Sequence, residues 1–157
     1  MSLVRRALPD DAGEVLRLRQ VMIDSVRPGS AHATGWHAES LPGLRARLAE
    51  PDGDFAAFVV DRPERPGELA ALVAGTLEYR IGKAGNPGGR VGYVFSVATD
   101  PEARRRGYAR ACMVELLEWF RERGAGQVDL TASADAEPLY ASLGFARTGD
   151  PFLRLVL

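Results

Sequence analysis

The period of the apolar residues changes several times along the chain, and each change marks a predicted element. Leu3–Leu8 fits a short strand. Asp11 and Glu14 then stand in capping-box spacing before four apolar residues of helical period, Val15, Leu18, Met22 and Val26. The segment 27–40 is rich in Gly, Ser and Ala, so it predicts a loop that leads into a short helix ending near Pro51.

Three strands are predicted in the middle of the chain, over Phe55–Val60, Leu69–Ile81 and Val91–Thr99. Short polar segments join them, and the second contains the turn sequence Asn86-Pro87-Gly88-Gly89, so an antiparallel meander is expected. Strict alternation gives the third strand two largely apolar faces, one with Tyr93, Phe95, Val97 and Thr99 and the other with Val94, Ser96 and Ala98. Two apolar faces predict a central position in the sheet.

The last third of the chain is predicted to alternate between helices and strands. Apolar residues recur at helical spacing from Ala109 to Phe120, and Gly124 is expected to end that helix. A strand over Val128–Ser133, a helix over Ala136–Leu143 and a pair of strands, Phe145–Thr148 and Phe152–Leu157, follow. A meander followed by a strand-helix-strand crossover predicts a mixed α/β fold.

Composition narrows the class of protein. The 157 residues fit one domain, over 1–157, and the formal net charge of -1 gives the chain as a whole no electrostatic tendency toward nucleic acid or a membrane surface. The single cysteine, Cys112, excludes an internal disulfide and fits a reducing compartment. No apolar run reaches the length of a membrane helix. We therefore expect a cytoplasmic protein.

Three arginines, Arg104-Arg105-Arg106, precede Gly107 at the point where a strand is predicted to give way to a helix. The dipole of a helix N-terminus disfavours cations, but its unpaired backbone N–H groups bind anions. A bound polyphosphate would resolve this conflict, and the small residues Gly107 and Ala109 would let it approach the backbone. The Gly-Lys-Ser/Thr of a P-loop is missing, and Asp129 alone keeps a dinucleotide site open.

The sequence 104–109 resembles the R/Q-x-x-G-x-G/A motif of the GCN5-related N-acetyltransferase (GNAT) superfamily, and "PLYASLGFARTG" at 138–149 is similar to a second motif of these proteins. The resemblance implies a GNAT-like fold with a central, mostly antiparallel sheet flanked by helices. It also implies a splayed parallel pair of strands, here Val91–Thr99 and Val128–Ser133. The expected activity is transfer of an acetyl group from acetyl-CoA to a primary amine of a small molecule or peptide, with no metal.

The resemblance also implies which residues bind the cosubstrate and which act in the reaction. The CoA diphosphate would rest on the turn, and the pantetheine arm would run beside the strand that ends at Thr99; the expected set is Val97, Ala98, Thr99, Arg104, Arg105, Arg106, Gly107, Tyr108, Ala109, Arg110 and Ser133. Ser133 stands where many members have asparagine. Tyr140 corresponds to the residue that meets the departing thiolate, and a phenol with a pKa near 10 is protonated at neutral pH.

Other candidate residues rest on their chemistry and position. Glu78 is a candidate general base, although a glutamate on a strand is also compatible with simple solvation. His32 and His37, with Trp36, lie where the loop of such proteins walls the acceptor site, so His37 is a candidate substrate contact. Cys112 falls within the apolar helical stripe, which favours packing over an acyl-carrier role and hence direct transfer.

Two functions therefore stay open, an N-acetyltransferase and a catalytically inactive CoA-binding sensor or interaction module on the same fold. Tyr140 favours the enzyme. A nucleic-acid partner is not expected, because three arginines without interleaved aromatic residues give too small a basic surface. The apolar C-terminal segment Phe152–Leu157 offers an edge through which a homodimer could form.

Overall fold

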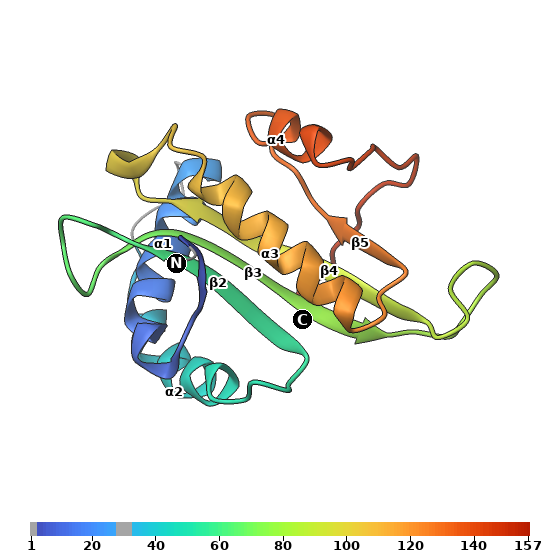
Figure 1. The fold of residues 1–157 in the computed structure, drawn as a ribbon, viewed down its shortest axis with the longest axis horizontal. Helices are drawn as coiled ribbons and strands as arrows, with labels where there is room; N and C mark the ends of the chain where they lie inside the picture. Colours follow the sequence, from blue (N-terminus) through green and yellow to red (C-terminus); the bar gives the residue numbers. More distant parts are fainter. Residues whose placement is uncertain (1–2, 28–32) are drawn as a thin grey trace.

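The computed structural model describes residues 3–27 and 33–157, and these contain a five-stranded sheet of order β1-β2-β3-β4-β5 (Figure 1). The neighbours β1 to β4 are antiparallel, whereas β4 and β5 are parallel. The predicted mixed α/β fold with one parallel pair is confirmed. The strands are β1 Arg5–Arg6, β2 Phe55–Asp61, β3 Leu69–Tyr79, β4 Arg90–Thr99 and β5 Gln127–Leu130.

Helices cover both faces of this sheet. In Figure 1, α3 crosses one face along its length, while α1 and α2 lie on the other. The short helix α4 follows β5, and a 3-10 helix, η3, connects β4 to the turn before α3. The bounds are η1 Pro9–Asp11, α1 Ala12–Val26, α2 Trp36–Leu48, η3 Pro101–Ala103, α3 Tyr108–Glu122 and α4 Glu137–Ser142.

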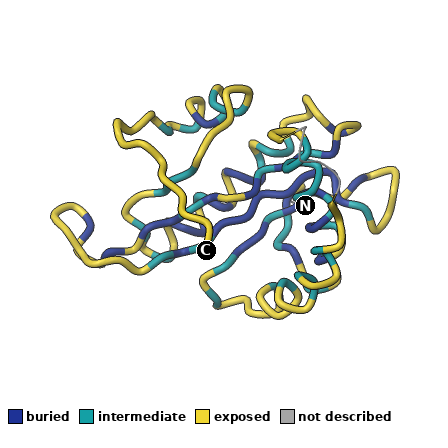
Figure 2. The backbone as a smooth tube through the Cα atoms, turned by 180° about the vertical axis from the view of Figure 1, so that it is seen from behind, coloured by how far each residue is buried: buried dark blue, intermediate teal, exposed yellow. Residues whose placement is uncertain are grey.

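The apolar stripe predicted for α3 forms the centre of the larger core. Met113, Leu116 and Phe120 are fully buried against the sheet. Gly75 of β3 and Gly92 of β4 lie beneath the Phe120 ring, and a Cβ at either position would come within 2.9 Å or 2.8 Å of it. The two glycines therefore allow the helix to pack closely on the strands, and the buried middle of the sheet in Figure 2 corresponds to this layer.

A β-bulge in β4 breaks the alternation expected for that strand. Ala74 of β3 pairs with Ser96, but the next residue, Gly75, pairs with Val94, so Phe95 is the extra residue on β4. A bulge of this kind reverses which face each following residue takes and increases the local twist. The two predicted sets of faces are therefore wrong beyond Val94.

The contacts on either side of the bulge demonstrate this reversal. Val94 and Val97 both belong to the apolar cluster beneath α3, although strict alternation puts them on opposite faces. Ala98 packs in the cluster beneath α1, and Ser96 accepts a hydrogen bond of 2.6 Å from Arg19 on that helix. β4 nevertheless lies inside the sheet, between β3 and β5, as predicted.

The N-terminal helix forms as expected, but its predicted capping box does not. The Asp11 carboxylate does not cap α1; it pairs with Arg5 of β1 at 2.8 Å and accepts from the N–H of Leu8, the N-cap of η1, at 2.7 Å. Glu14 accepts from the backbone N–H of Leu69 at 2.8 Å and pairs with Arg17 at 2.7 Å. Each carboxylate thus pairs with a guanidinium and also accepts from a backbone N–H outside α1. Hydrogen bonds to a charged guanidinium are stronger than one to a neutral helical N–H.

Two other boundaries differ from the prediction. Trp36 and His37, expected in a loop, form the first turn of α2, where both side chains contact Gln20 of α1. The strand predicted over Leu3–Leu8 is limited to two residues, and β5 ends at Leu130, before Ser133. These are tertiary effects that local composition does not encode.

The predicted C-terminal strands, Phe145–Thr148 and Phe152–Leu157, are wrong: neither segment is a strand. The first turns back onto α4, where the Phe145 N–H donates to the Tyr140 carbonyl at 3.1 Å and Arg147 pairs with Glu137. These local contacts compete with pairing to β5. The final six residues are exposed along their length (Figure 2).

Candidate active site

The turn between β4 and α3 presents a run of backbone donors to open space. No hydrogen bond joins a backbone N–H of Arg104, Arg105, Arg106 or Gly107 to another described residue, and Tyr108, Ala109 and Arg110 form the first turn of α3, where N–H groups have no intrahelical acceptor. Gly107 precedes α3 with φ 76°, and Arg105, with φ 64°, is the one non-glycine residue at positive φ in the part of the chain that the structure describes. Such alternation of backbone hand points successive N–H groups into one concavity, which binds anions.

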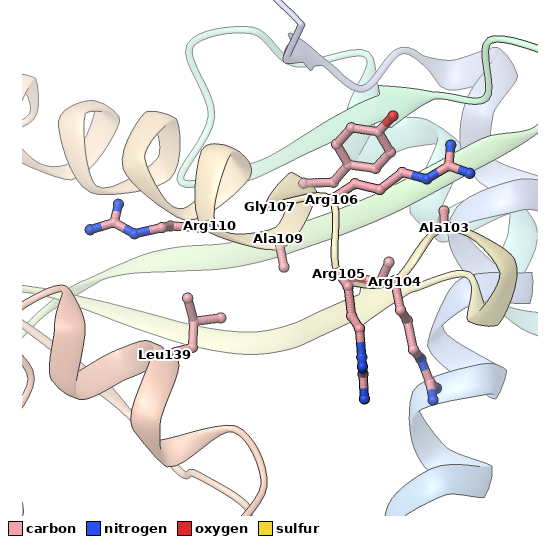
Figure 3. Close-up of a pocket in the computed structure, with 10 residues that line it drawn as sticks. Ala103, Arg104, Arg105, Arg106, Gly107, Ala109, Arg110 and Leu139 are labelled. Atoms are coloured by element: carbon pink, nitrogen blue, oxygen red, sulfur yellow. The ribbon is translucent and has the colours of Figure 1, made fainter.

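The same turn lines a pocket of about 160 Å³. In Figure 3, Arg104 and Arg105 extend side by side from the turn, while Arg106 and Arg110 point away from them. Arg104 and Arg105 form no salt bridge within residues 3–27 and 33–157, so their charge is free for an anionic ligand. The lining residues are Thr99, Ala103, Arg104, Arg105, Arg106, Gly107, Tyr108, Ala109, Arg110 and Leu139.

Gly107 leaves this pocket open. A Cβ added at Gly107 would meet no atom within 4 Å, so the space above the residue is empty of protein. Its left-handed conformation is one that other residues adopt only with strain. The pocket therefore joins three features suited to a diphosphate: unpaired N–H groups, free guanidinium groups and room for close approach.

A gap beside β4 continues from this pocket. The parallel pairing with β5 ends at Val94 and Leu130, whereas β4 runs on to Thr99. Val97, Ala98 and Thr99 thus have β3 on one side and no strand on the other among the described residues. The bulge at Phe95 lies where the pairing stops, and its added twist turns β4 away from β5. An extended ligand could pair with this open edge.

Tyr140 lies on α4, one residue after Leu139 of the pocket lining. Its ring is buried in the apolar cluster beneath α3 and meets the Phe145 ring edge-on, with centroids 6.0 Å apart. Burial raises the pKa of Tyr140 above its ordinary value. The hydroxyl forms no hydrogen bond with any described residue, so this protonated group is available to a ligand.

Ser133 and Glu78 already have protein partners. The Ser133 hydroxyl accepts from the Ala136 N–H at 3.3 Å and thereby caps the turn that leads into α4. The Glu78 carboxylate pairs with Arg80 at 2.8 Å on the exposed side of β3. Neither residue lines the pocket at the turn, but the Ser133 hydroxyl still has its proton to donate, and the Glu78 Oε1 takes no part in the contact with Arg80.

His37 faces α1 from the start of α2. Its Nε2 lies 3.0 Å from Gln20 Oε1, and its ring packs edge-on against Trp36 at 4.2 Å between centroids. Trp36 also donates to the same amide oxygen at 3.1 Å. These contacts hold the two aromatic side chains between the helices. His32, the other candidate, lies outside the described residues.

The end of β4 carries a buried carboxylate, Asp100, that the sequence pattern does not predict. Asp100 accepts from the Glu102 N–H at 3.0 Å, which caps η3, and pairs with Arg17 of α1 at 2.9 Å. A third contact comes from Arg62, at 3.2 Å, which follows β2. Burial alone would raise the pKa of Asp100, but the hydrogen bonds from Arg17 and Glu102 and the charge of Arg62 lower it overall. An aspartate before Pro101 signals a cap; nothing in the sequence links it to the two arginines.

Comparison with known proteins identifies the family. Residues 22–145 match the sequence profile described as Acetyltransferase (GNAT) family. The chain therefore belongs to the GNAT acetyltransferase family. Its fold is also that of a predicted acetyltransferase from Clostridium acetobutylicum solved with acetyl-CoA, with a TM-score of 0.80 at 22% identity, over 99% of this chain and 96% of the other.

Two curated relatives bear names with small-molecule acceptors. A mycothiol acetyltransferase from Cellulomonas flavigena is 36% identical over 134 residues, which are 80% of this chain and 38% of that protein. An aminoglycoside N(6')-acetyltransferase type 1 from Serratia marcescens is 32% identical over 144 residues, 88% of each chain. The chain thus spans well under half the length of the mycothiol acetyltransferase.

Two further findings concern the described part of the chain. No group of three or more His, Cys, Asp or Glu side chains there is arranged to hold a metal ion. None of its helices has the length and apolar character needed to span a bilayer.

Proposed function

We propose that residues 1–157 act as a single N-acetyltransferase domain, which transfers an acetyl group from acetyl-CoA to a primary amine of a small molecule. The observation that carries this proposal is the run of unpaired N–H groups from Arg104 to Arg110 beside two free guanidinium groups. This arrangement suits the diphosphate of CoA. The open edge of β4 suits the pantetheine arm, which has amides able to pair with a strand.

In the proposed reaction, the neutral amine attacks the thioester carbonyl carbon. The C–N bond forms, the C–S bond breaks, and the nitrogen gives up one proton to solvent or a base. Tyr140 donates a hydrogen bond to the departing thiolate, and the raised pKa of its phenol keeps that proton in place at neutral pH. A phenol with an ordinary pKa near 10 is a weaker acid than a thiol with a pKa near 8.5, so complete proton transfer to the thiolate is uphill. The hydroxyl therefore stabilises the thiolate by a hydrogen bond.

The acceptor is proposed to be a small molecule, in line with the names of the mycothiol and aminoglycoside acetyltransferases. Glu78 remains our candidate base and His37 our candidate acceptor contact. Glu78 keeps its Oε1 outside the contact with Arg80, whereas the Nε2 of His37 is engaged by Gln20 and would have to leave that contact to bind an acceptor. A catalytically inactive CoA-binding module is the alternative, and the unpartnered hydroxyl of Tyr140 favours the enzyme.

A thermal-shift titration tests cosubstrate choice. Acetyl-CoA at one hundred times its dissociation constant is expected to raise the free energy of unfolding by about 2.7 kcal/mol. NAD and ATP should give much smaller shifts at the same concentration, because neither carries a pantetheine arm for the edge of β4. A shift with NAD alone would contradict the proposal, and binding without turnover across a panel of amines would support the inactive module.

Cys112 provides a test of direct transfer. The thiol is fully buried on α3, and burial raises its pKa to about 12, so it is protonated and unreactive at neutral pH. Cys112→Ala is expected to keep the wild-type turnover while losing about 1 kcal/mol of stability, the cost of removing one buried methyl-sized group. Native protein should resist iodoacetamide, as monitored by mass spectrometry. Rapid labelling with loss of turnover would instead indicate an acyl-cysteine intermediate.

A further inference from the structure

Arg62, the first residue after β2, is a buried cation surrounded by carboxylates. Its side chain is only 3% exposed. The guanidinium lies 2.6 Å from Glu102 and 3.2 Å from Asp100. It also reaches Glu64 at 3.2 Å and Glu68 at 3.6 Å, both within its own loop. Arg62 therefore joins the loop between β2 and β3 to the segment that begins at Asp100.

That segment sets the position of the arginine turn, the residues Arg104 to Gly107 between η3 and α3. Asp100 and Glu102 belong to the start of η3, and Ala103 at its end is buried. The unpaired N–H groups begin at the next residue, Arg104. Because the backbone is continuous, a displacement of η3 moves the first of these donors by a similar amount. A diphosphate seat made of backbone groups depends on such placement, since its atoms have no side-chain freedom with which to adapt.

The backbone anchors the start of this segment through the Asp100 N–H, which donates to the Ala70 carbonyl at 2.8 Å, but the other side-chain contacts of the segment do not replace Arg62. Of the two carboxylates Asp100 and Glu102, Arg17 pairs only with Asp100, at 2.9 Å. Glu102 would be left with Arg65, a half-exposed side chain 3.4 Å away. Without the Arg62 charge, Glu64, Glu68 and the two η3 carboxylates would repel one another across the interface, and the loop would separate from η3. Arg62 is thus the side chain that both fills this interface and neutralises it.

We propose that Arg62 is a positioning residue for the donor diphosphate: by holding η3 through Asp100 and Glu102, it fixes the backbone donors of the turn without touching the ligand. The inference rests on the proposed function and deepens it. Its consequence is selective, because only donors that carry a diphosphate use the turn. A truncated donor, acetyl-pantetheine, keeps the thioester and the arm that pairs with β4 but lacks the diphosphate.

The test compares these two donors in steady-state kinetics. For Arg62→Met, the kcat/KM with acetyl-CoA is expected to fall at least tenfold, through KM, with kcat within about twofold of wild type. With acetyl-pantetheine, the loss in kcat/KM should stay within about twofold. Arg62→Lys keeps the charge but loses the planar fork that spans two carboxylates, so its loss should be intermediate and again limited to acetyl-CoA.

Arg65→Met is the matched control. It removes the same charge from the same loop, and Arg65 also contacts Glu102 and Glu68, but from solvent. Its kcat/KM with acetyl-CoA should change by no more than about twofold. An equal loss for both donors, or an equal loss in Arg65→Met, would overturn the proposal, because either would indicate general destabilisation or general charge loss.

Two measurements keep the outcome decisive. Thermal melts establish that each variant is folded at the assay temperature, and Arg62→Lys decides the question if Arg62→Met does not fold. Failure of the proposed function would appear already in the wild type, as no binding of CoA and no acetyl transfer. A wild type that binds and turns over acetyl-CoA, with Arg62→Lys and Arg62→Met unaffected, would refute the role of Arg62 alone.

Discussion

Replacing Gly107 by glutamate is expected to weaken CoA binding at least a hundredfold, or about 2.8 kcal/mol. The residue sits at φ 76°, which costs a non-glycine residue about 1–2 kcal/mol, and its empty Cβ direction opens where the diphosphate is proposed to lie. A carboxylate placed there would occupy the seat and repel the phosphates. Isothermal titration calorimetry with CoA measures the loss directly.

Gly85 offers a matched control for this substitution. It has φ 85°, and a Cβ there would also meet no atom within 4 Å, but it lies in the loop between β3 and β4 and lines no part of the pocket. Gly85→Glu should therefore show a similar loss of thermal stability with CoA affinity near that of the wild type. Unchanged affinity in Gly107→Glu would argue against the proposed phosphate seat.

Tyr140→Phe is expected to lower kcat about a hundredfold, which is the lower end of the rate contribution of a positioned acid. The affinity for CoA should stay within about twofold of the wild type. The substitution removes only the hydroxyl, and the ring contact with Phe145 should be kept. Tyr79→Phe is the control, because it also removes a tyrosine hydroxyl. Tyr79 lies at the exposed end of β3, and its hydroxyl donates to Asp54. Equal turnover of Tyr140→Phe and wild type would remove the catalytic role.

The pH profile gives Tyr140 an independent test. Burial raises its pKa above the ordinary value near 10, so the hydroxyl stays protonated through the neutral range. The contribution of the hydroxyl to kcat should therefore be constant at neutral pH and be lost only as the pH rises through the raised pKa, above about 10. In Tyr140→Phe this alkaline decrease should be absent.

The parts of the fold that follow from local pattern could be predicted from the sequence. The apolar stripe from Cys112 to Phe120 specifies the buried face of α3, and the helix ends beside Gly124, at φ 80°, as its position suggested. The arginine turn was also accessible, because a basic run beside a glycine, between a strand and a helix, is typical of an anion-binding turn. The same residues line the pocket in the folded chain.

Features that depend on partners distant in sequence could not be predicted. Phe95 is a bulge only because of how β3 and β4 pair, and an unbroken apolar strand gives no sign of it. The carboxylates of Asp11 and Glu14 are spaced for a capping box, but Asp11 pairs with Arg5 of β1, and Glu14 pairs with Arg17 and accepts from the Leu69 N–H at the start of β3. Arg62 reads as one of several charges in a polar loop, and its burial against Asp100 appears only in three dimensions.

The bulge at Phe95 also constrains how this chain can vary in length. Removal of one residue there would restore strict alternation and exchange the two faces over the rest of β4, so that Val97 would turn toward α1 and Ser96 toward α3. At Ala84 and Gly85 the situation differs, because they lie beyond the last paired residues of this hairpin, Lys83 and Asn86, and extra residues there would not shift the pairing of β3 with β4. Insertions and deletions among homologues should therefore gather at these two residues and avoid the stretch from Val94 to Thr99.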